Sequence, residues 1–91
     1  MQFLTQENRI YAEDEQGKLV AEATFPSISE NSVCLDHTFV DPSLRGQGVA
    51  GMLIQEVIAY AKDNRKKIKP VCSYAVSWFE KHPEYAEFIT E

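Results

Sequence analysis

The chain has few of the residues that mark secreted or membrane proteins. Its 91 residues contain only two cysteines, Cys34 and Cys72, and no apolar stretch long enough to span a bilayer. The N-terminus has no basic region followed by an apolar run, so no secretory signal is predicted. In a small chain without such a signal, the two thiols are expected to be free. We therefore expect a cytoplasmic protein in which residues 1–91 form a single domain.

Positive charge is also scarce. Nine Lys and Arg residues face 14 Asp and Glu, for a net charge of −5, which argues against general nucleic-acid binding because that needs a basic face. Two cysteines and two histidines match no zinc spacing, so no metal is expected. The acidic balance would suit a cationic substrate such as an amine. One basic cluster comprises Lys62, Arg65, Lys66, Lys67 and Lys69. It is either a solvated helix end that complements the helix dipole or a local attraction for an anion.

Alternating apolar residues predict a small sheet. Strands are expected at 9–14 and 18–25, joined as an antiparallel hairpin by Glu15-Gln16-Gly17. A third strand is expected at 33–40, and its alternation places His37 among the apolar side chains of Val33, Leu35 and Phe39. The opposite face of that strand would carry Cys34, Asp36, Thr38 and Val40.

Apolar residues at spacings of three and four predict a helix from about Gln47 to Asn64. Its stripe would pack on the sheet and consists of Val49, Met52, Leu53, Val57, Ile58 and Ala61. A fourth strand at 67–73 should run parallel to the third, because a helix connects them. A short helix at 75–81 and an apolar tail at 85–89 complete the domain. The predicted class is α+β, a mixed and mostly antiparallel sheet with two helices.

A glycine-rich turn between a strand and a helix is the most informative segment. Val40-Asp41-Pro42 ends the third strand, and Arg45-Gly46-Gln47-Gly48-Val49-Ala50 opens the helix. The first amides of a helix lack partners inside it and, with the helix dipole, can hold a phosphate or pyrophosphate. The spacing matches neither the Rossmann glycines nor a Walker loop. An ordinary surface loop is the alternative to a site for a phosphate-bearing cofactor.

This segment resembles the Arg/Gln-x-x-Gly-x-Gly/Ala signature of the GCN5-related N-acetyltransferases (GNAT), in which the turn holds the pyrophosphate of acetyl-CoA. The resemblance covers roughly residues 33–81 and implies a reduced acyl-CoA N-acyltransferase fold, similar to the family's short cysteine-containing subgroup. The two helices that build much of the acceptor side in the family are missing. The resemblance implies acetyl-CoA as cofactor and a cofactor-binding set of Phe39, Val40, Arg45, Gly46, Gln47, Gly48, Val49 and Ala50.

The family's usual general acid is a tyrosine in a pattern similar to Ala75-Val76-Ser77-Trp78-Phe79-Glu80-Lys81. Phe79 stands in its place, so that role cannot be carried over. Cys72 is the alternative, because helix N-termini favour the thiolate, which could accept the acetyl group with His37 as its base. A packed thiol and a core histidine are the competing interpretations, and Trp78 and Phe79 are expected in the core.

The predicted function is transfer of an acetyl group from acetyl-CoA to an amine of a small molecule or a protein. A non-catalytic acyl-CoA-binding or sensing module and a protein-interaction domain are the alternatives. Neither nucleic acid nor a membrane is expected as a partner, and the chain is expected to be a monomer or a weak homodimer.

Overall fold

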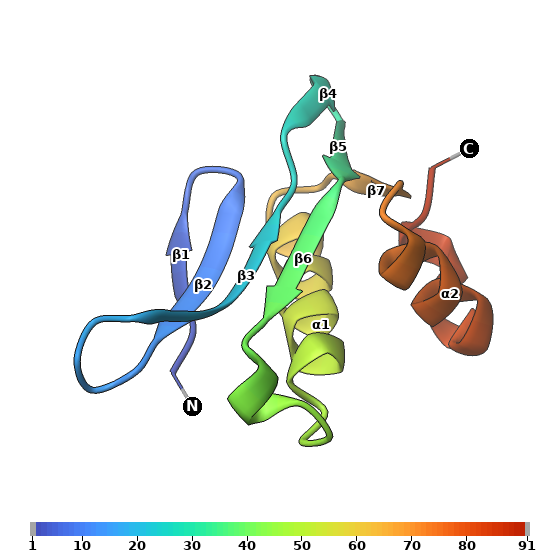
Figure 1. Ribbon diagram of the computed structural model, residues 1–91. Helices are drawn as coiled ribbons and strands as arrows, with labels where there is room; N and C mark the ends of the chain where they lie inside the picture. Colours follow the sequence, from blue (N-terminus) through green and yellow to red (C-terminus); the bar gives the residue numbers. More distant parts are fainter. Residues whose placement is uncertain (1, 91) are drawn as a thin grey trace.

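The computed structural model describes residues 2–90 and contains two small sheets and two α-helices (Figure 1). The strands of the first sheet are antiparallel neighbours in the order β1 (Leu4–Gln6), β2 (Arg9–Glu13), β3 (Leu19–Thr24) and β6 (His37–Val40). The second sheet comprises β4 (Ser27–Ser29), β5 (Ser32–Leu35) and β7 (Lys67–Pro70). The predicted α+β class, with mostly antiparallel strands, is confirmed.

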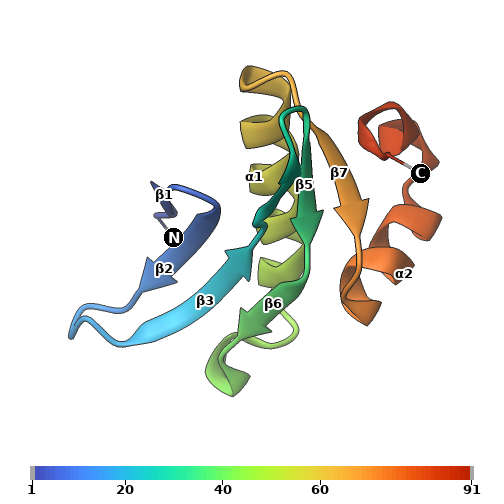
Figure 2. The ribbon, with the colours of Figure 1, turned by 90° about the horizontal axis from the view of Figure 1, so that it is seen from above.

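Helix α1 (Val49–Asp63) packs on one face of the first sheet, and α2 (Ser73–Lys81) follows β7. Two short 3₁₀ helices complete the chain, η1 (Pro42–Leu44) before α1 and η2 (Pro83–Phe88) after α2. Figure 2 shows β5 continuing directly into β6, while β7 runs beside β5 and α2 stands beyond β7. Within residues 2–90, no helix is both long enough and apolar enough to cross a membrane.

The β2–β3 hairpin and the parallel pair β5–β7 are as predicted. The third strand, in contrast, is not one strand. It divides at Asp36, whose N–H donates to the Thr24 carbonyl at 3.3 Å, although Thr24 is paired with His37. Two consecutive residues thus stand opposite one, which is a β-bulge and bends the strand. The expected single sheet becomes two, and β1 and β4 are further strands that the sequence did not indicate.

The two sheets separate just beyond Leu35. The Leu35 carbonyl accepts N–H bonds from both Val71 (3.0 Å) and Cys72 (3.2 Å), which forms the last link between β5 and the chain leaving β7. Among the described strands, β6 then pairs only with β3. Its other edge is left open, facing the start of α2.

The core lies between α1 and the two sheets. Five of the six predicted stripe residues are buried, but Met52 is 40% exposed, and Ile54, which the stripe did not include, is fully buried. Ile54 is buried because α1 contacts β7 and η2 as well as β2, β3 and β6, so its buried face is wider than one sheet would require. Trp78 and Phe79 are buried as predicted. The tail at 85–89 packs back against the core, also as predicted.

Candidate active site

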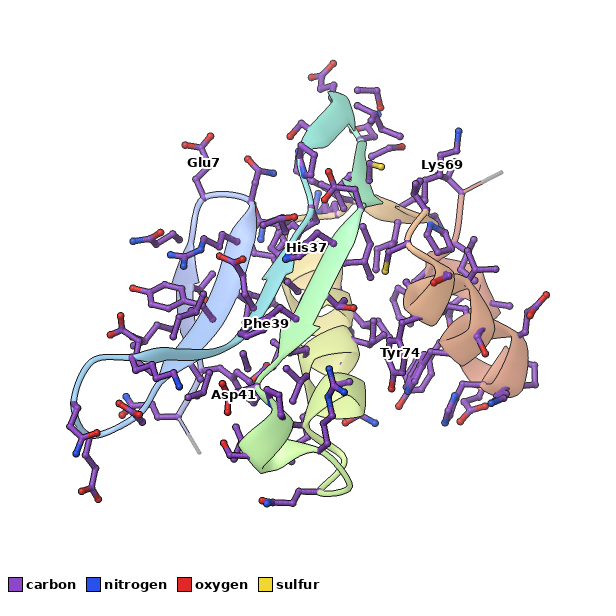
Figure 3. The ribbon with its side chains drawn as sticks, viewed as in Figure 1. Glu7, His37, Phe39, Asp41, Lys69 and Tyr74 are labelled. Atoms are coloured by element: carbon purple, nitrogen blue, oxygen red, sulfur yellow. The ribbon has the colours of Figure 1, made fainter. Side chains whose placement is uncertain are left out.

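A cleft of about 370 Å³ opens where β6 and the start of α2 diverge. The glycine-rich loop and the first turn of α1 close one end of it, and α2 forms one wall; in Figure 3, Tyr74 lies between α1 and α2. The residues that border the cleft are Thr38, Val40, Leu44, Arg45, Gly46, Gly48, Val49, Ala50 and Tyr74.

Asp41 fixes the turn that leads from β6 into the loop. Its carboxylate accepts hydrogen bonds from the Ser43 hydroxyl (2.6 Å) and the Ser43 N–H (3.0 Å), and Lys18 Nζ lies 3.6 Å away. The bond from the Ser43 hydroxyl, followed by that from the Ser43 amide, lowers the pKa of Asp41 below its usual 3.8. Asp41 is therefore ionised at neutral pH, which keeps the cap of η1 in place.

Gly46 and Gly48 allow the loop to turn into the helix. Their φ values are +83° and +74°, in the left-handed region that side-chain-bearing residues rarely adopt. The first hydrogen bond inside α1 runs from Met52 N–H to the Gly48 carbonyl. The amides of Val49 and Ala50 precede that bond and have no acceptor inside the helix, so they can hold an anion at the end of the cleft.

Six of the eight predicted cofactor residues border this cleft, and Phe39 and Gln47 do not. The Asp41 N–H donates to the Val20 carbonyl on β3, and by the alternation of an antiparallel ladder the backbone of Phe39 also faces β3. The same alternation turns the backbone of Val40 toward the open edge. The Gln47 N–H donates to the Leu44 carbonyl at 3.4 Å.

Three cleft residues were not predicted as site residues: Thr38, Leu44 and Tyr74. Thr38 shares a strand face with Val40, so alternation alone contained the information needed to find it. The position of Tyr74 depends on where α2 docks, which no local pattern indicates. Burial raises the pKa of the Tyr74 phenol above its usual 10.0. The phenol is therefore protonated at neutral pH and can donate a hydrogen bond.

Cys72 lies just behind Thr38 and is half-buried at the N-cap of α2. Its Sγ accepts the Ala75 N–H at 3.4 Å and is 3.8 Å from the Thr38 hydroxyl oxygen. Both cysteines are free, as expected.

The prediction that His37 sits among apolar neighbours in the core is wrong, and its role as a base for Cys72 stays a prediction. Neighbouring residues of a strand point to opposite faces, so Thr38 meets Cys72 while His37 points away from α1 (Figure 3). The His37 side chain is 53% exposed, and its Nε2 is 3.5 Å from a carboxylate oxygen of Glu22. Glu22 is also paired with Arg9. The structure brings Thr38 and Cys72 together and leaves His37 on the uncovered face of the sheet.

Charge around the cleft comes from few residues. Arg45 is the basic side chain on its border. The basic cluster defined above lies at the other end of α1, which is about 22 Å long for its 15 residues. It is therefore too distant to attract an anion to the loop, and Lys66 and Lys67 instead donate to the carbonyls of Glu30 and Glu87. A second hollow beside Ser43 and Leu44 is bordered by acidic residues, which are Glu13, Asp14 and Glu15.

The family of the chain follows from comparison with known proteins. A family model described as GCN5-related N-acetyl-transferase matches residues 9–88. The chain belongs to this family. The solution structure of a GCN5-like protein from Staphylococcus aureus is similar to this GNAT chain, with a TM-score of 0.81 and 32% identity over 98% of this chain and 87% of that one. The comparison with curated proteins found no match.

Longer GNAT structures share the fold. An acetyltransferase from Bacillus cereus has a TM-score of 0.67 and 24% identity, and 87% of this chain matches 63% of that one. A GNAT acetyltransferase from Elizabethkingia anophelis, solved with acetyl-CoA bound, has a TM-score of 0.64 and 15% identity over 85% of this chain and 51% of that one. The present chain thus spans about half to two thirds of the length of these two proteins.

Proposed function

We propose that this GNAT chain binds acetyl-CoA in the cleft and transfers its acetyl group to an amine of a small molecule or a protein. The observation that carries the proposal is the cleft itself, which joins the free amides at the start of α1 to the open edge of β6 in a chain of this family. The pyrophosphate would lie on the amides of Gly48, Val49 and Ala50, with Arg45 beside it.

The pantetheine arm would then run along β6 from Val40 toward Thr38. The backbone groups of Val40 face the open edge of the sheet and are available to the arm. In this orientation the thioester would reach Thr38, which lies about 7 Å from Val40 along the strand. It would also reach the side chain of Tyr74. The backbone of Phe39 faces β3, so Phe39 would take no part in binding the arm.

In direct transfer, the uncharged amine attacks the thioester carbonyl, the C–S bond breaks, and the CoA thiolate takes up a proton. In transfer through Cys72, the Cys72 thiolate attacks first and releases CoA, and the amine then attacks the new thioester. The position of Cys72 at a helix N-terminus, with its sulfur 3.8 Å from the hydroxyl oxygen of the cleft residue Thr38, supports the second route. His37 does not face Cys72, so the base for either route is not assigned to it.

Titration with acetyl-CoA, read by thermal unfolding and by the mass of the intact chain, tests the proposal. At about 100 times the dissociation constant, a ligand of the folded state adds about 2.7 kcal/mol, and for this size we expect Tm to rise by about 10 °C or more. Arg45→Ala should reduce that rise, whereas Lys62→Ala, in the distant basic cluster, should not. No rise with the unmodified protein would contradict the proposal.

The mass of the intact chain and the turnover of acetyl-CoA together distinguish direct transfer from transfer through Cys72. One added acetyl group that is lost in Cys72→Ala, together with loss of turnover, would support the covalent route. Acetyl-CoA consumption with amines by Cys72→Ala would support direct transfer. The buried Phe79, 5% exposed, favours one other function, that of an acyl-CoA sensor, because it offers no proton where the family has tyrosine. A sensor would bind acetyl-CoA without consuming it in the presence of any amine.

A further inference from the structure

The inner end of the cleft is closed by a contact between β6 and α2. The hydroxyl oxygen of Thr38 and the sulfur of Cys72 are 3.8 Å apart, which is van der Waals or weak hydrogen-bond distance and leaves no room for a carbon atom between them. Thr38 borders the cleft, and Cys72 stands directly behind it. On this side, therefore, the cleft reaches Thr38 and does not include Cys72.

Backbone bonds hold both partners of this pair in place. The Cys72 N–H donates to the Leu35 carbonyl at 3.2 Å, and the Cys72 sulfur accepts the Ala75 N–H at 3.4 Å. Thr38 is held by the pairing of β6 with β3, opposite the fully buried Ala23. The main chain is therefore fixed at both residues, and the Cys72 sulfur is held as well.

Cys72 is hydrogen-bonded to two residues of the core. Leu35 and Ala75, the residues bonded to Cys72, are both 0% exposed. Packed interiors have few voids larger than a water molecule, and inserting methylene groups into them is destabilising. A group that pushed past Thr38 and Cys72 would have to displace this packing.

We propose that Thr38 and Cys72 together limit the acyl group of the cofactor to a short chain, so that acetyl is accepted and chains of four or more carbons are rejected. The inference rests on the proposed function, because it places the thioester at the Thr38 end of the cleft. It assigns to Cys72 a selective role that holds for both routes of transfer.

The test is a binding series with CoA, acetyl-CoA, butyryl-CoA and hexanoyl-CoA, measured by calorimetry with no acceptor present. For the unmodified protein, hexanoyl-CoA should bind about tenfold or more weakly than acetyl-CoA, which corresponds to the lower part of the cost of overpacking. Binding of hexanoyl-CoA as tight as that of acetyl-CoA would overturn the inference and leave the proposed function intact. Failure of CoA and every acyl-CoA to bind would overturn both.

Two variants locate the limit. Thr38→Ala and Cys72→Ala each remove atoms from the closed end, so each should bring hexanoyl-CoA closer to acetyl-CoA in affinity, with the affinity for CoA measured in the same variant as the reference. Cys34→Ala is the matched control, because Cys34 is also a half-buried free thiol but lies on β5 outside the cleft border. An unchanged affinity ratio in both cleft variants would overturn the assignment to these two residues. If either variant fails to fold, the series with the unmodified protein still decides the length limit.

Discussion

Gly48 acts on the site through its backbone angle. A Cβ built on this residue would meet no atom within 4 Å, but φ is +74°, so any side chain is strained there. We expect Gly48→Ala to lower the free energy of unfolding by about 1–2 kcal/mol and to weaken CoA binding, since a relaxed loop moves the amides of Val49 and Ala50. Urea unfolding and calorimetry would measure the two effects.

Gly17 provides the control for this substitution. It has a similar φ of +80° and equally open surroundings, but it lies in the β2–β3 turn, away from the cleft. Gly17→Ala should therefore cost similar stability and leave CoA affinity unchanged. Equal loss of affinity in the two variants would mean that the effect is general destabilisation.

The carboxylate of Asp41 is a second single-residue feature with a measurable consequence. Since its pKa in the folded state is lowered, chiefly by the Ser43 hydroxyl, its contribution to stability is present above the unfolded pKa near 3.8 and is lost as pH falls through the lower folded value. Carbon NMR titration should find the Asp41 pKa below 3.8 in the intact protein and higher in Ser43→Ala. An identical pKa in both proteins would show that the hydroxyl is not the cause.

At the scale of the elements, the strands and helices with a periodic apolar pattern were predictable from the sequence, whereas the bend within residues 33–40 was not. The β2–β3 hairpin, α1 and the parallel β5–β7 pair follow from alternation, spacing and connection length. The bulge at Asp36 leaves the alternation of residues 33–40 apparently intact, so the sequence does not reveal that the strand divides. The exposure of His37 depends on that division, and the position of Tyr74 depends on where α2 docks, which is why the sequence indicated the loop residues on the cleft border but not the residues facing them.

The start of α2 allows a prediction at the same scale. The Cys72 sulfur caps the helix by accepting the Ala75 N–H. Loss of an N-cap acceptor costs about 0.5–2 kcal/mol. Cys72→Ala should therefore unfold at lower urea concentration, whereas Cys72→Ser, which keeps an acceptor, should stay closer to the unmodified protein. Equal loss of stability in both variants would indicate that packing of the sulfur, and not the cap, matters.

At the scale of the whole molecule, the core is small, so the free energy of unfolding is expected to be small as well. Phe25 is fully buried, and its ring centroid lies 4.9 Å from that of Tyr60 on α1, so it links the chain just after β3 to the helix. Phe25→Ala should cost about 3–5 kcal/mol and leave the chain close to unfolding at 37 °C. Thermal unfolding by circular dichroism measures this, with Val71→Ala as control, since Val71 is 51% exposed. A small effect of Phe25→Ala would contradict this view of the core.

The separation of the basic cluster from the cleft has a consequence for kinetics. A cofactor carrying phosphates approaches a protein of net charge −5 at the end that offers Arg45 but also the acidic residues Glu13, Asp14 and Glu15. Added salt screens the repulsion between like charges over about 10 Å at 0.1 M. In stopped-flow measurements, the association rate of CoA should therefore increase with ionic strength, so the protein would capture its cofactor faster in salt than in dilute buffer.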